Sequence, residues 1–503
     1  MTSENDRTTS DGGTRRGLLR AVAATTAGVL SVGAAGDATA RTERPTGDPA
    51  APVRSQSDGV RIGVERVHRF DAAASEMLTE HVYDLPNSLT DLEIASRGFD
   101  SASVSVRSTE RLERVDATTL RWTGTGQPRL TTGLSVGGET LTDGNRGTYV
   151  DDGRVAFGYR ILLDHSWLYD SDGPAVTGVD ETVSYDGEGF VGTGVVYAGP
   201  HTRETQRVDG VDQSIAVPDA VESAVDVDGI LDVLALGERR LQPRLAYDRT
   251  SVVVLPDDRA GSARFTGRTI VHDFLLFGRS ARVDGVENTP AHEYNHTIYG
   301  VFGTGETYWL KEATAEYHGY LLSLHAGAGT FEAFLDAVRT EEYADAVLSE
   351  VGPEASGFAD YEKGAHVLAA LDGEIRRRSD GAATLADVLG TDEYDLSSYE
   401  QFRAAVADAA GDETVAAWVD QYVRTDALPT VPTDPERYAL GGTAPPVGGL
   451  AARFDDGDGD VQFREVVQVI SAYNDGDAAL DFGTVVRVIS AYNSGDGWDA
   501  VDA

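Results

Sequence analysis

Residues 292–296 read His-Glu-Tyr-Asn-His, and residues 309–313 read Trp-Leu-Lys-Glu-Ala. On a helix, positions i and i+4 lie on the same face, so His292 and His296 can direct their ring nitrogens at one ion with Glu293 beside them. This spacing predicts a helix at the first motif and a cation between its two histidines.

The flanking residues support two helices joined by a loop. Thr289 and Pro290 precede the first motif as an expected N-cap and first helical residue, which places a helix start where the motif needs one. A glycine-rich break follows at 299–305, and a second helix is expected from about residue 307 to 325. The loop can bring Glu312, which lies sixteen positions beyond His296, back to the histidines.

These residue types suit a catalytic zinc ion. Catalytic Zn²⁺ takes three protein ligands and keeps one position open, and a carboxylate beside it takes a proton from the attacking water. We predict His292, His296 and Glu312 as the zinc ligands and Glu293 as the general base. The alternative is an ordinary i,i+4 histidine pair with a buried, ion-paired glutamate.

Together with a third block, the two motifs resemble the gluzincin metallopeptidases, in particular the aminopeptidase N and glycyl aminopeptidase branches. The third block is the YxKGA-like segment 361–365. The resemblance implies that Tyr361 donates a hydrogen bond to the developing oxyanion, a role that preorganised donors fill in acyl transfer. The spacing between His296 and Glu312 is shorter than expected in either branch, which leaves the branch open, and Ala313 replaces the family's glycine, a mild change. No strand similar to GAMEN is present, so cleavage as an endopeptidase or an exopeptidase stays open.

Glu316 lies one helical turn beyond Glu312. It can orient a metal-bound imidazole from outside the ligand set, as metal-ligating histidines usually require. Equally, it can be a solvated carboxylate on a helix face.

Composition removes several classes of function. The chain of 503 residues has no cysteine, which excludes thiol catalysis, disulfides and thiolate metal sites. It also lacks a P-loop and a GxSxG motif. A formal net charge of −41 disfavours nucleic acid as a partner, because phosphate backbones are repelled.

The strong acidity, with arginine in place of almost every lysine, is typical of halophile proteins. Carboxylates at this density repel one another, and high salt screens that repulsion. We therefore expect low salt to unfold or inactivate the protein.

The N-terminal residues predict export. Arg15 and Arg16 precede a weakly apolar run at 21–35, and residues 38–40 offer an A-x-A cleavage site, a pattern similar to a twin-arginine signal. The run is too short to cross a membrane, so the mature chain is expected to have no transmembrane span and an extracellular or cell-surface location.

The pattern along the chain predicts an α+β multidomain protein. Alternating segments at 104–107, 120–123 and 154–161 indicate antiparallel β-structure, and apolar residues at helical spacing follow the first motif. The expected parts are a signal (1–40), a linker (41–58), a β-rich domain (59–200), a gluzincin catalytic domain (201–425), a second linker (426–450) and a C-terminal repeat (451–503).

The C-terminal repeat has two copies, at 466–474 and 485–493, each after an acidic loop. It resembles a dockerin or a shortened EF-hand pair, which implies Ca²⁺ and a cell-surface protein partner. The candidate calcium ligands are Asp456, Asp458, Asp460 and Glu465. The alternative is a solvated acidic turn between packed amphipathic helices.

Taken together, the sequence predicts a secreted zinc peptidase that acts on peptides or proteins. The rival interpretation is a non-catalytic binding or adhesion protein on a peptidase scaffold, in which the β-rich domain and the terminal repeat hold a surface partner.

Overall fold

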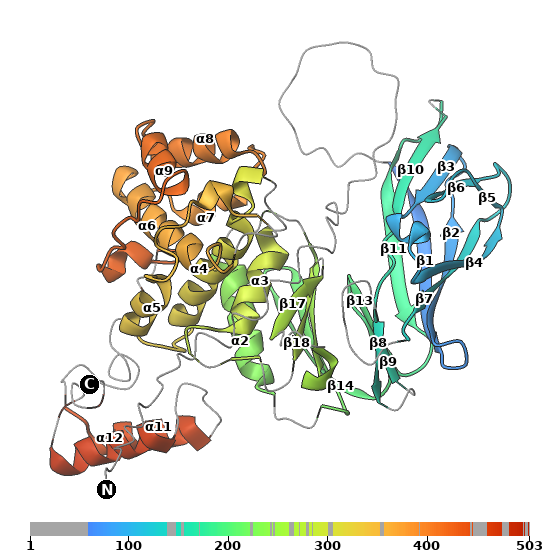
Figure 1. Cartoon of the computed structure of the whole chain (residues 1–503). Helices are drawn as coiled ribbons and strands as arrows, with labels where there is room; N and C mark the ends of the chain where they lie inside the picture. The colour runs from blue at the N-terminus through green and yellow to red at the C-terminus, as the bar shows by residue number, and fades with distance from the viewer. Residues whose placement is uncertain are drawn as a thin grey trace, which may run out of the picture.

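The structure is a computed structural model of the chain. It describes residues 59–501 with gaps at 138–146, 152–154, 171, 222–224, 242–243, 245–246, 261–265, 271, 278–280, 284, 300–304, 353–356, 392, 443–444, 446–459, 475–481, 496 and 498–500. The predicted signal and first linker lie outside the described residues. In the rest, an N-terminal β-rich part is followed by a mostly helical part, a mixed α+β architecture (Figure 1).

Two sheets form most of the N-terminal part. In spatial order, the first sheet contains β11 (Val176–Tyr185), β1 (Val60–Asp71), β2 (Glu76–Asp84), β7 (Arg129–Ser135) and β4 (Val104–Glu110), and the second contains β10 (Asp164–Tyr169), β3 (Leu89–Ala95), β6 (Thr119–Trp122) and β5 (Leu112–Arg114). Their pairs are antiparallel except that β1 runs parallel to β11. One apolar core, with Ile62 and Leu130 from the first sheet and Leu92 from the second, joins them. A short 3₁₀ helix, η2 (Arg97–Asp100), follows β3.

A smaller third sheet comes next. It contains β12 (Gly189–Val191), β13 (Val195–Ala198), β9 (Val155–Tyr159) and β8 (Gly147–Asp151), in that spatial order. The predicted strands at 104–107, 120–123 and 154–161 lie within or overlap β4, β6 and β9.

The fourth sheet packs against the helical part of the chain. Its order is β14 (His201–Val208), β15 (Val211–Pro218), β16 (Arg249–Leu255), β18 (Asp273–Phe277) and β17 (Gly267–Ile270). Successive side chains of a strand point to opposite faces. Val252 and Val254 accordingly pack on the helices, whereas Val253 and Leu255 pack against the third sheet. A strand buried on both faces has this continuous apolar sequence.

Helices cover the other face of the fourth sheet and continue toward the C-terminus (Figure 1). They are α2 (Val227–Arg240), α3 (Thr289–Tyr299), α4 (Leu310–His325), α5 (Phe331–Val338), α6 (Glu362–Arg378), α7 (Leu385–Gly390), α8 (Tyr399–Ala410) and α9 (Val415–Val423), with 3₁₀ helices η3 (Asp257–Ala260), η4 (Gly305–Thr307), η5 (Leu348–Glu350) and η6 (Pro435–Tyr438). No helix among the described residues is both long and apolar enough to span a membrane.

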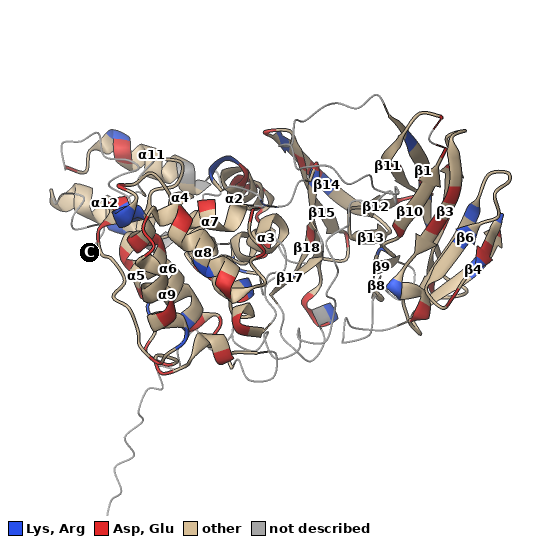
Figure 2. Ribbon diagram, turned by 90° about the horizontal axis from the view of Figure 1, so that it is seen from above, with Lys and Arg blue, Asp and Glu red and all other residues tan. Residues whose placement is uncertain are grey.

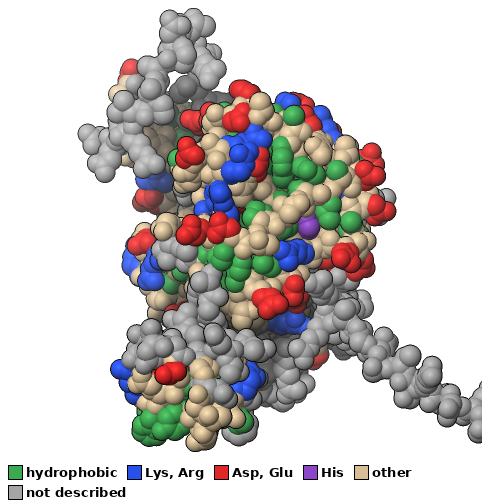
Figure 3. Space-filling view, turned by 90° about the vertical axis from the view of Figure 1, so that its left-hand side faces the viewer, with side chains coloured by type: hydrophobic (Ala, Val, Ile, Leu, Met, Phe, Trp, Pro, Cys, Tyr) green, Lys and Arg blue, Asp and Glu red, His purple; other side chains and the backbone are tan. Residues whose placement is uncertain are grey.

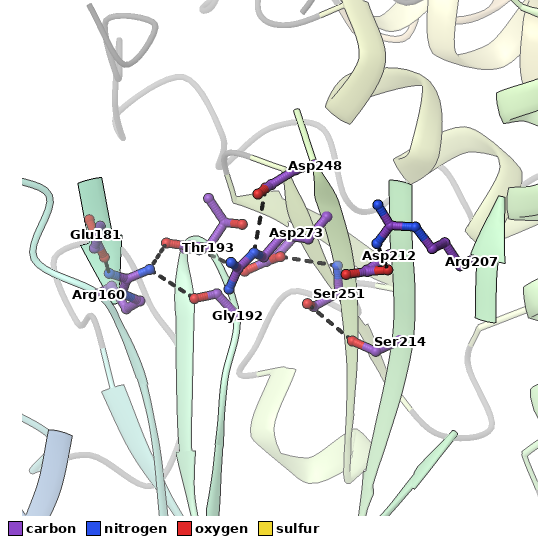
Figure 4. Close-up of polar contacts among 12 residues, drawn as sticks. Arg160, Glu181, Gly192, Thr193, Arg207, Asp212, Ser214, Asp248, Ser251 and Asp273 are labelled. Carbon is purple, nitrogen blue, oxygen red and sulfur yellow. Dashed lines mark hydrogen bonds and ion pairs between the residues drawn. The ribbon is translucent and has the colours of Figure 1, made fainter. Parts of the chain in front are cut away.

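Charged groups join the sheets where apolar packing ends. Arg160 pairs with Glu181 of β11 and also donates to two carbonyls of the 192–193 turn, at 2.9 and 2.8 Å (Figure 4). Asp273, fully buried at the start of β18, accepts from the backbone N–H groups of Gly194 and Ser251 at 2.6 and 3.1 Å. These contacts of Arg160 and Asp273 connect the third sheet to the first and fourth sheets.

Two helices, α11 (Phe463–Asn474) and α12 (Phe482–Ser494), form the C-terminal repeat. They enclose a small core that includes Val469 and Val488, which are equivalent positions of the two copies. Among the described residues, aspartate and glutamate positions occur on strands and helices alike (Figure 2). The acidic residues of the described part are therefore not confined to one element.

Candidate metal centre

Helix α3 carries the first motif and begins as predicted, but with a different cap. The Asn288 side chain accepts from the backbone N–H of Ala291 at 2.9 Å, which is the N-cap contact. The expected cap, Thr289, is already the first residue of the helix. Asparagine and threonine are both good caps, so the sequence alone does not choose between neighbouring candidates.

Helices α3 and α4 approach closely at the site. A Cβ atom added to Gly319 of α4 would lie 3.2 Å from the backbone nitrogen of His292 and 3.3 Å from its Cα. Glycine therefore allows the two backbones to lie near each other. This close packing puts the carboxylate-bearing turn of α4 against the histidine face of α3.

Three predicted ligands meet between the two helices. The Oε2 atom of Glu312 lies 3.5 Å from Nε2 of His292 and 3.2 Å from Nε2 of His296, and the two Nε2 atoms are 3.2 Å apart. One ligand atom from each of the three residues falls within 4.8 Å of the others. Within the part of the chain that the structure describes, this is the single group of three or more histidine or acidic residues that close together.

The two oxygens of Glu312 have different surroundings. Oε2 faces the histidines, whereas Oε1 accepts a hydrogen bond from Nζ of Lys311 at 2.7 Å. Burial alone would raise the pKa of Glu312, but the positive charge of Lys311, followed by contacts with His296 and His292, holds it well below its usual range. The carboxylate is therefore ionised, as a metal ligand must be.

Glu316 approaches the other nitrogen of His292. Its Oε2 lies 3.9 Å from Nδ1, on the side of the ring away from Glu312. Burial lowers the pKa of His292, but the nearby carboxylates of Glu312 and Glu316 outweigh burial and raise it to about 10. A metal that binds here displaces a proton from this ring.

Glu293 points toward the edge of the fourth sheet. The hydroxyl of Thr269, on β17, donates to Oε2 of Glu293 at 2.6 Å and lies 2.9 Å from its backbone carbonyl oxygen. Gly267 on the same strand leaves room, since a Cβ atom there would lie 2.6 Å from Cγ of Glu293. The edge strand thus holds one oxygen of the predicted base.

Tyr361 lies beside a predicted ligand, His292, at the start of α6. Its ring stacks on that of His292 with 6.0 Å between centroids and 2° between planes. Burial, followed by the charges of Glu312 and Asp360, raises the pKa of the Tyr361 hydroxyl well above its usual value. The phenol therefore keeps its proton near neutral pH and can donate it in a hydrogen bond.

Sequence reasoning missed two residues that contact the site. Thr269 gave no motif signal, because its role depends on how β17 pairs with β18 and packs on α3. Strands β17 and β18 pair as antiparallel neighbours at the edge of the fourth sheet, which places Thr269 beside α3. Lys311 lies within the motif at 309–313, and the rarity of lysine in the chain is a signal that could identify it.

The donor set fits zinc. Two imidazole nitrogens and one carboxylate oxygen form a three-ligand set of the catalytic type, and they converge from two rigid helices. The outer contacts of Glu316 and Lys311 supply the support that such ligands usually have.

Only part of the predicted calcium site can be placed. Asp456 and Asp458 lie outside the described residues. Asp460 forms an isolated bridge with Gly497, and Glu465 is buried with its Oε2 accepting from the backbone N–H of Gln462 at 2.9 Å. That contact caps the start of α11, the reciprocal half of a capping box.

No protein-family model matches the sequence, and no curated protein matches it. Similar solved structures include an M1 zinc metallopeptidase of Deinococcus radiodurans, at 15% identity and a TM-score of 0.45, over 75% of this chain and 96% of that one. An aminopeptidase N family protein of Idiomarina loihiensis has 14% identity and a TM-score of 0.43, over 74% of this chain and 76% of that one. Aminopeptidase A of Legionella pneumophila has 12% identity and a TM-score of 0.41, over 74% of this chain and 50% of that one.

Proposed function

We propose that the protein is a zinc-dependent peptidase. The observation that carries the proposal is the meeting of His292, His296 and Glu312 within 4.8 Å, with Glu293 and Tyr361 at the same place. Five residues from three helices and separate stretches of sequence supply the ligand set, the base and the oxyanion donor of one reaction.

Each residue has a distinct role in the proposed reaction. Zinc, when bound, supplies a Lewis acid that polarises the scissile carbonyl and makes water easier to deprotonate. Glu293 takes the proton from the attacking water and later delivers it to the leaving amine. Tyr361 donates a hydrogen bond to the oxygen on which negative charge develops.

The test compares zinc content and peptide cleavage for the mature protein and Glu293→Gln in high salt. We expect the variant to retain stoichiometric zinc and to lose about 10²–10⁴-fold in kcat, the usual contribution of a general base. Glu332→Gln, an exposed substitution on α5, is the matched control and is expected to cleave as the unmodified protein does. If all of these proteins bound zinc and none of them cleaved peptides, that result would instead favour a binding protein on a peptidase scaffold.

The binding or adhesion alternative has one observation in its favour. Four of the large apolar side chains that the structure leaves exposed, Phe463, Val467, Val486 and Tyr492, lie on the helix pair α11 and α12. Figure 3 shows hydrophobic side chains gathered at one end of this unit. We propose that the pair is a dockerin-like module for a cell-surface protein, with Ca²⁺ at the preceding loop.

Export through a twin-arginine signal is also part of the proposal. It would place the peptidase outside the cell, where peptides or proteins of the surroundings are its substrates. An N-terminal sequence of the secreted protein that begins near Arg41 is the expected result, and retention of residues 1–40 in that protein would contradict it.

A further inference from the structure

Lysine is almost absent from this chain. The sequence has 42 lysine and arginine residues, and just two of them, Lys311 and Lys363, are lysines. Lys363 is fully buried and donates to the carbonyl oxygens of Ala344 and Ala346 at 2.9 and 2.6 Å, whereas Lys311 is partly buried. Arginine serves at the other 40 basic positions, so lysine at position 311 invites a specific explanation.

The contact of Lys311 is not a consequence of helical spacing. Neighbouring residues on a helix point in directions about 100° apart and do not face each other. Nevertheless, Nζ of Lys311 reaches Oε1 of the adjacent Glu312 at 2.7 Å, the length of a charge-assisted hydrogen bond. The Lys311 side chain is 23% exposed and that of Glu312 8%, so the contact lies largely out of water.

We propose that Lys311 is a positioning residue that makes Glu312 a one-oxygen ligand. By occupying Oε1, its ammonium leaves only Oε2 for the metal, on the side where the two histidines lie. One oxygen from Glu312 and one nitrogen from each histidine make three protein ligands, and a fourth position stays open for substrate or water. The inference rests on the proposed function and deepens it.

The choice of lysine over arginine follows from the shapes of the two side chains. A guanidinium presents a planar fork that binds both oxygens of a carboxylate, whereas an ammonium acts as a compact point charge. Arginine at 311 would therefore compete with the metal for Oε2. Lysine can hold Oε1 and leave Oε2 free.

The experiment measures zinc dissociation constants by chelator competition, in high salt, for the full chain and for Lys311→Arg, Lys311→Met and Lys363→Arg. We expect Lys311→Arg to weaken zinc binding about 10–100-fold, the usual effect of changing an outer partner of a ligand. Lys311→Met should bind zinc as tightly as the parent or more tightly, because a positive charge near the ion is removed. Lys363→Arg should bind zinc as the parent does.

This order of affinities distinguishes a positioning role of Lys311 from a general requirement for positive charge at that position. If the ammonium merely neutralised buried carboxylates, the charge-conserving arginine would bind zinc better than methionine does, and that result would overturn the proposal. Equal affinities in all four proteins would also overturn it.

A second measurement covers the case in which Lys311→Arg does not fold. Cobalt in place of zinc in Lys311→Met is expected to absorb visible light more weakly than in the parent, because both oxygens of Glu312 can then bind and the coordination number rises. An unchanged cobalt spectrum would contradict the proposal. Failure of the peptidase function is distinguishable, since a protein that binds zinc but cleaves nothing still yields the affinity order, whereas a parent that binds no metal overturns both.

Discussion

Histidines pack inside both halves of the molecule, and the surroundings of His68 in one half and of His292 in the other are opposite. In the β-rich part, His68, His81 and His165 lie within the packed sheets near Arg66 and Arg160. Burial, followed by these positive charges, lowers the pKa of His68 to about 3. Burial, with Arg66 adding to it, also lowers that of His165 to about 3.

Between α3 and α4 the neighbours are carboxylates. Burial lowers the pKa of His292 there as well, yet Glu312 and Glu316 raise it to about 10. The β-rich histidines instead bond to neutral partners, as His68 does with Thr79 at 2.8 Å and His165 with Tyr83 at 3.2 Å. His68 and His292 are the same residue type, and the charge of the neighbours distinguishes an imidazole that stays neutral in the fold from one suited to a cation.

The largest expected effect is on stability in acid. A histidine with a pKa of about 3 in the fold and 6.5 when unfolded contributes stability that is complete above pH 6.5. That contribution is lost as the pH falls from about 6.5 to about 3, and for His68 alone it amounts to at most roughly 5 kcal/mol. Hydrogen exchange in high salt should show β1 and β2 losing protection as the pH is lowered through this window.

His68→Gln tests the origin of that acid sensitivity. Glutamine keeps a polar partner for Thr79 but does not titrate, so the variant should lose less stability than the parent between pH 6.5 and pH 4. Equal losses in the two proteins would show that His68 does not govern acid unfolding.

The second effect compares one histidine from each half. His292→Gln is expected to weaken zinc binding more than about 100-fold, beyond the range for outer partners of a ligand. His68→Gln should leave zinc affinity unchanged, because its neighbours are arginines and a threonine. Chelator competition measures the zinc affinity of both variants. Similar affinities would show that His292 and His68 do not differ in their importance for zinc binding.

The contrast also explains what the sequence could predict. His292, His296 and Glu293 follow from the spacing of one helix, and Glu312 from a second motif at a distance that a loop can close. Strands with alternating polar and apolar residues, and helices with an apolar stripe, can be predicted from short stretches of sequence in the same way, as in β4, β9 and α6. Each of these signals lies within a short stretch of chain.

Contacts between different helices and strands cannot be predicted in this way. Thr269 contacts Glu293 because β17 is the edge strand beside α3, an arrangement that depends on the order of the fourth sheet. Arg66 lies near His81 because β1 and β2 pair in a register that sets these two residues opposite each other. Such contacts depend on the tertiary arrangement, for which a single sequence holds no local pattern.

A smaller effect is expected at Glu316. Its Oε2 lies 3.9 Å from Nδ1 of His292, longer than a good hydrogen bond, so its support of the ring is weaker than a direct contact would give. Glu316→Gln should weaken zinc binding about tenfold, the lower end for outer partners. Glu332→Gln is the control, and an unchanged zinc affinity in Glu316→Gln would make Glu316 a simple helix-face carboxylate.

The smallest effect is expected at Thr269, where a hydroxyl acts on the base and touches no metal ligand. Thr269→Val keeps the shape of the side chain and removes the donor to Glu293. Loss of that one hydrogen bond, roughly 1.5–3 kcal/mol when the acceptor is charged, should lower kcat by about 10–100-fold at most. Zinc content and KM should not change, because Thr269 contacts only Glu293 within the site. Thr269→Ser restores the hydroxyl and should recover most of kcat. If valine and serine were equally active, the edge strand would merely pack against α3, and Glu293 would need no partner outside its own helix.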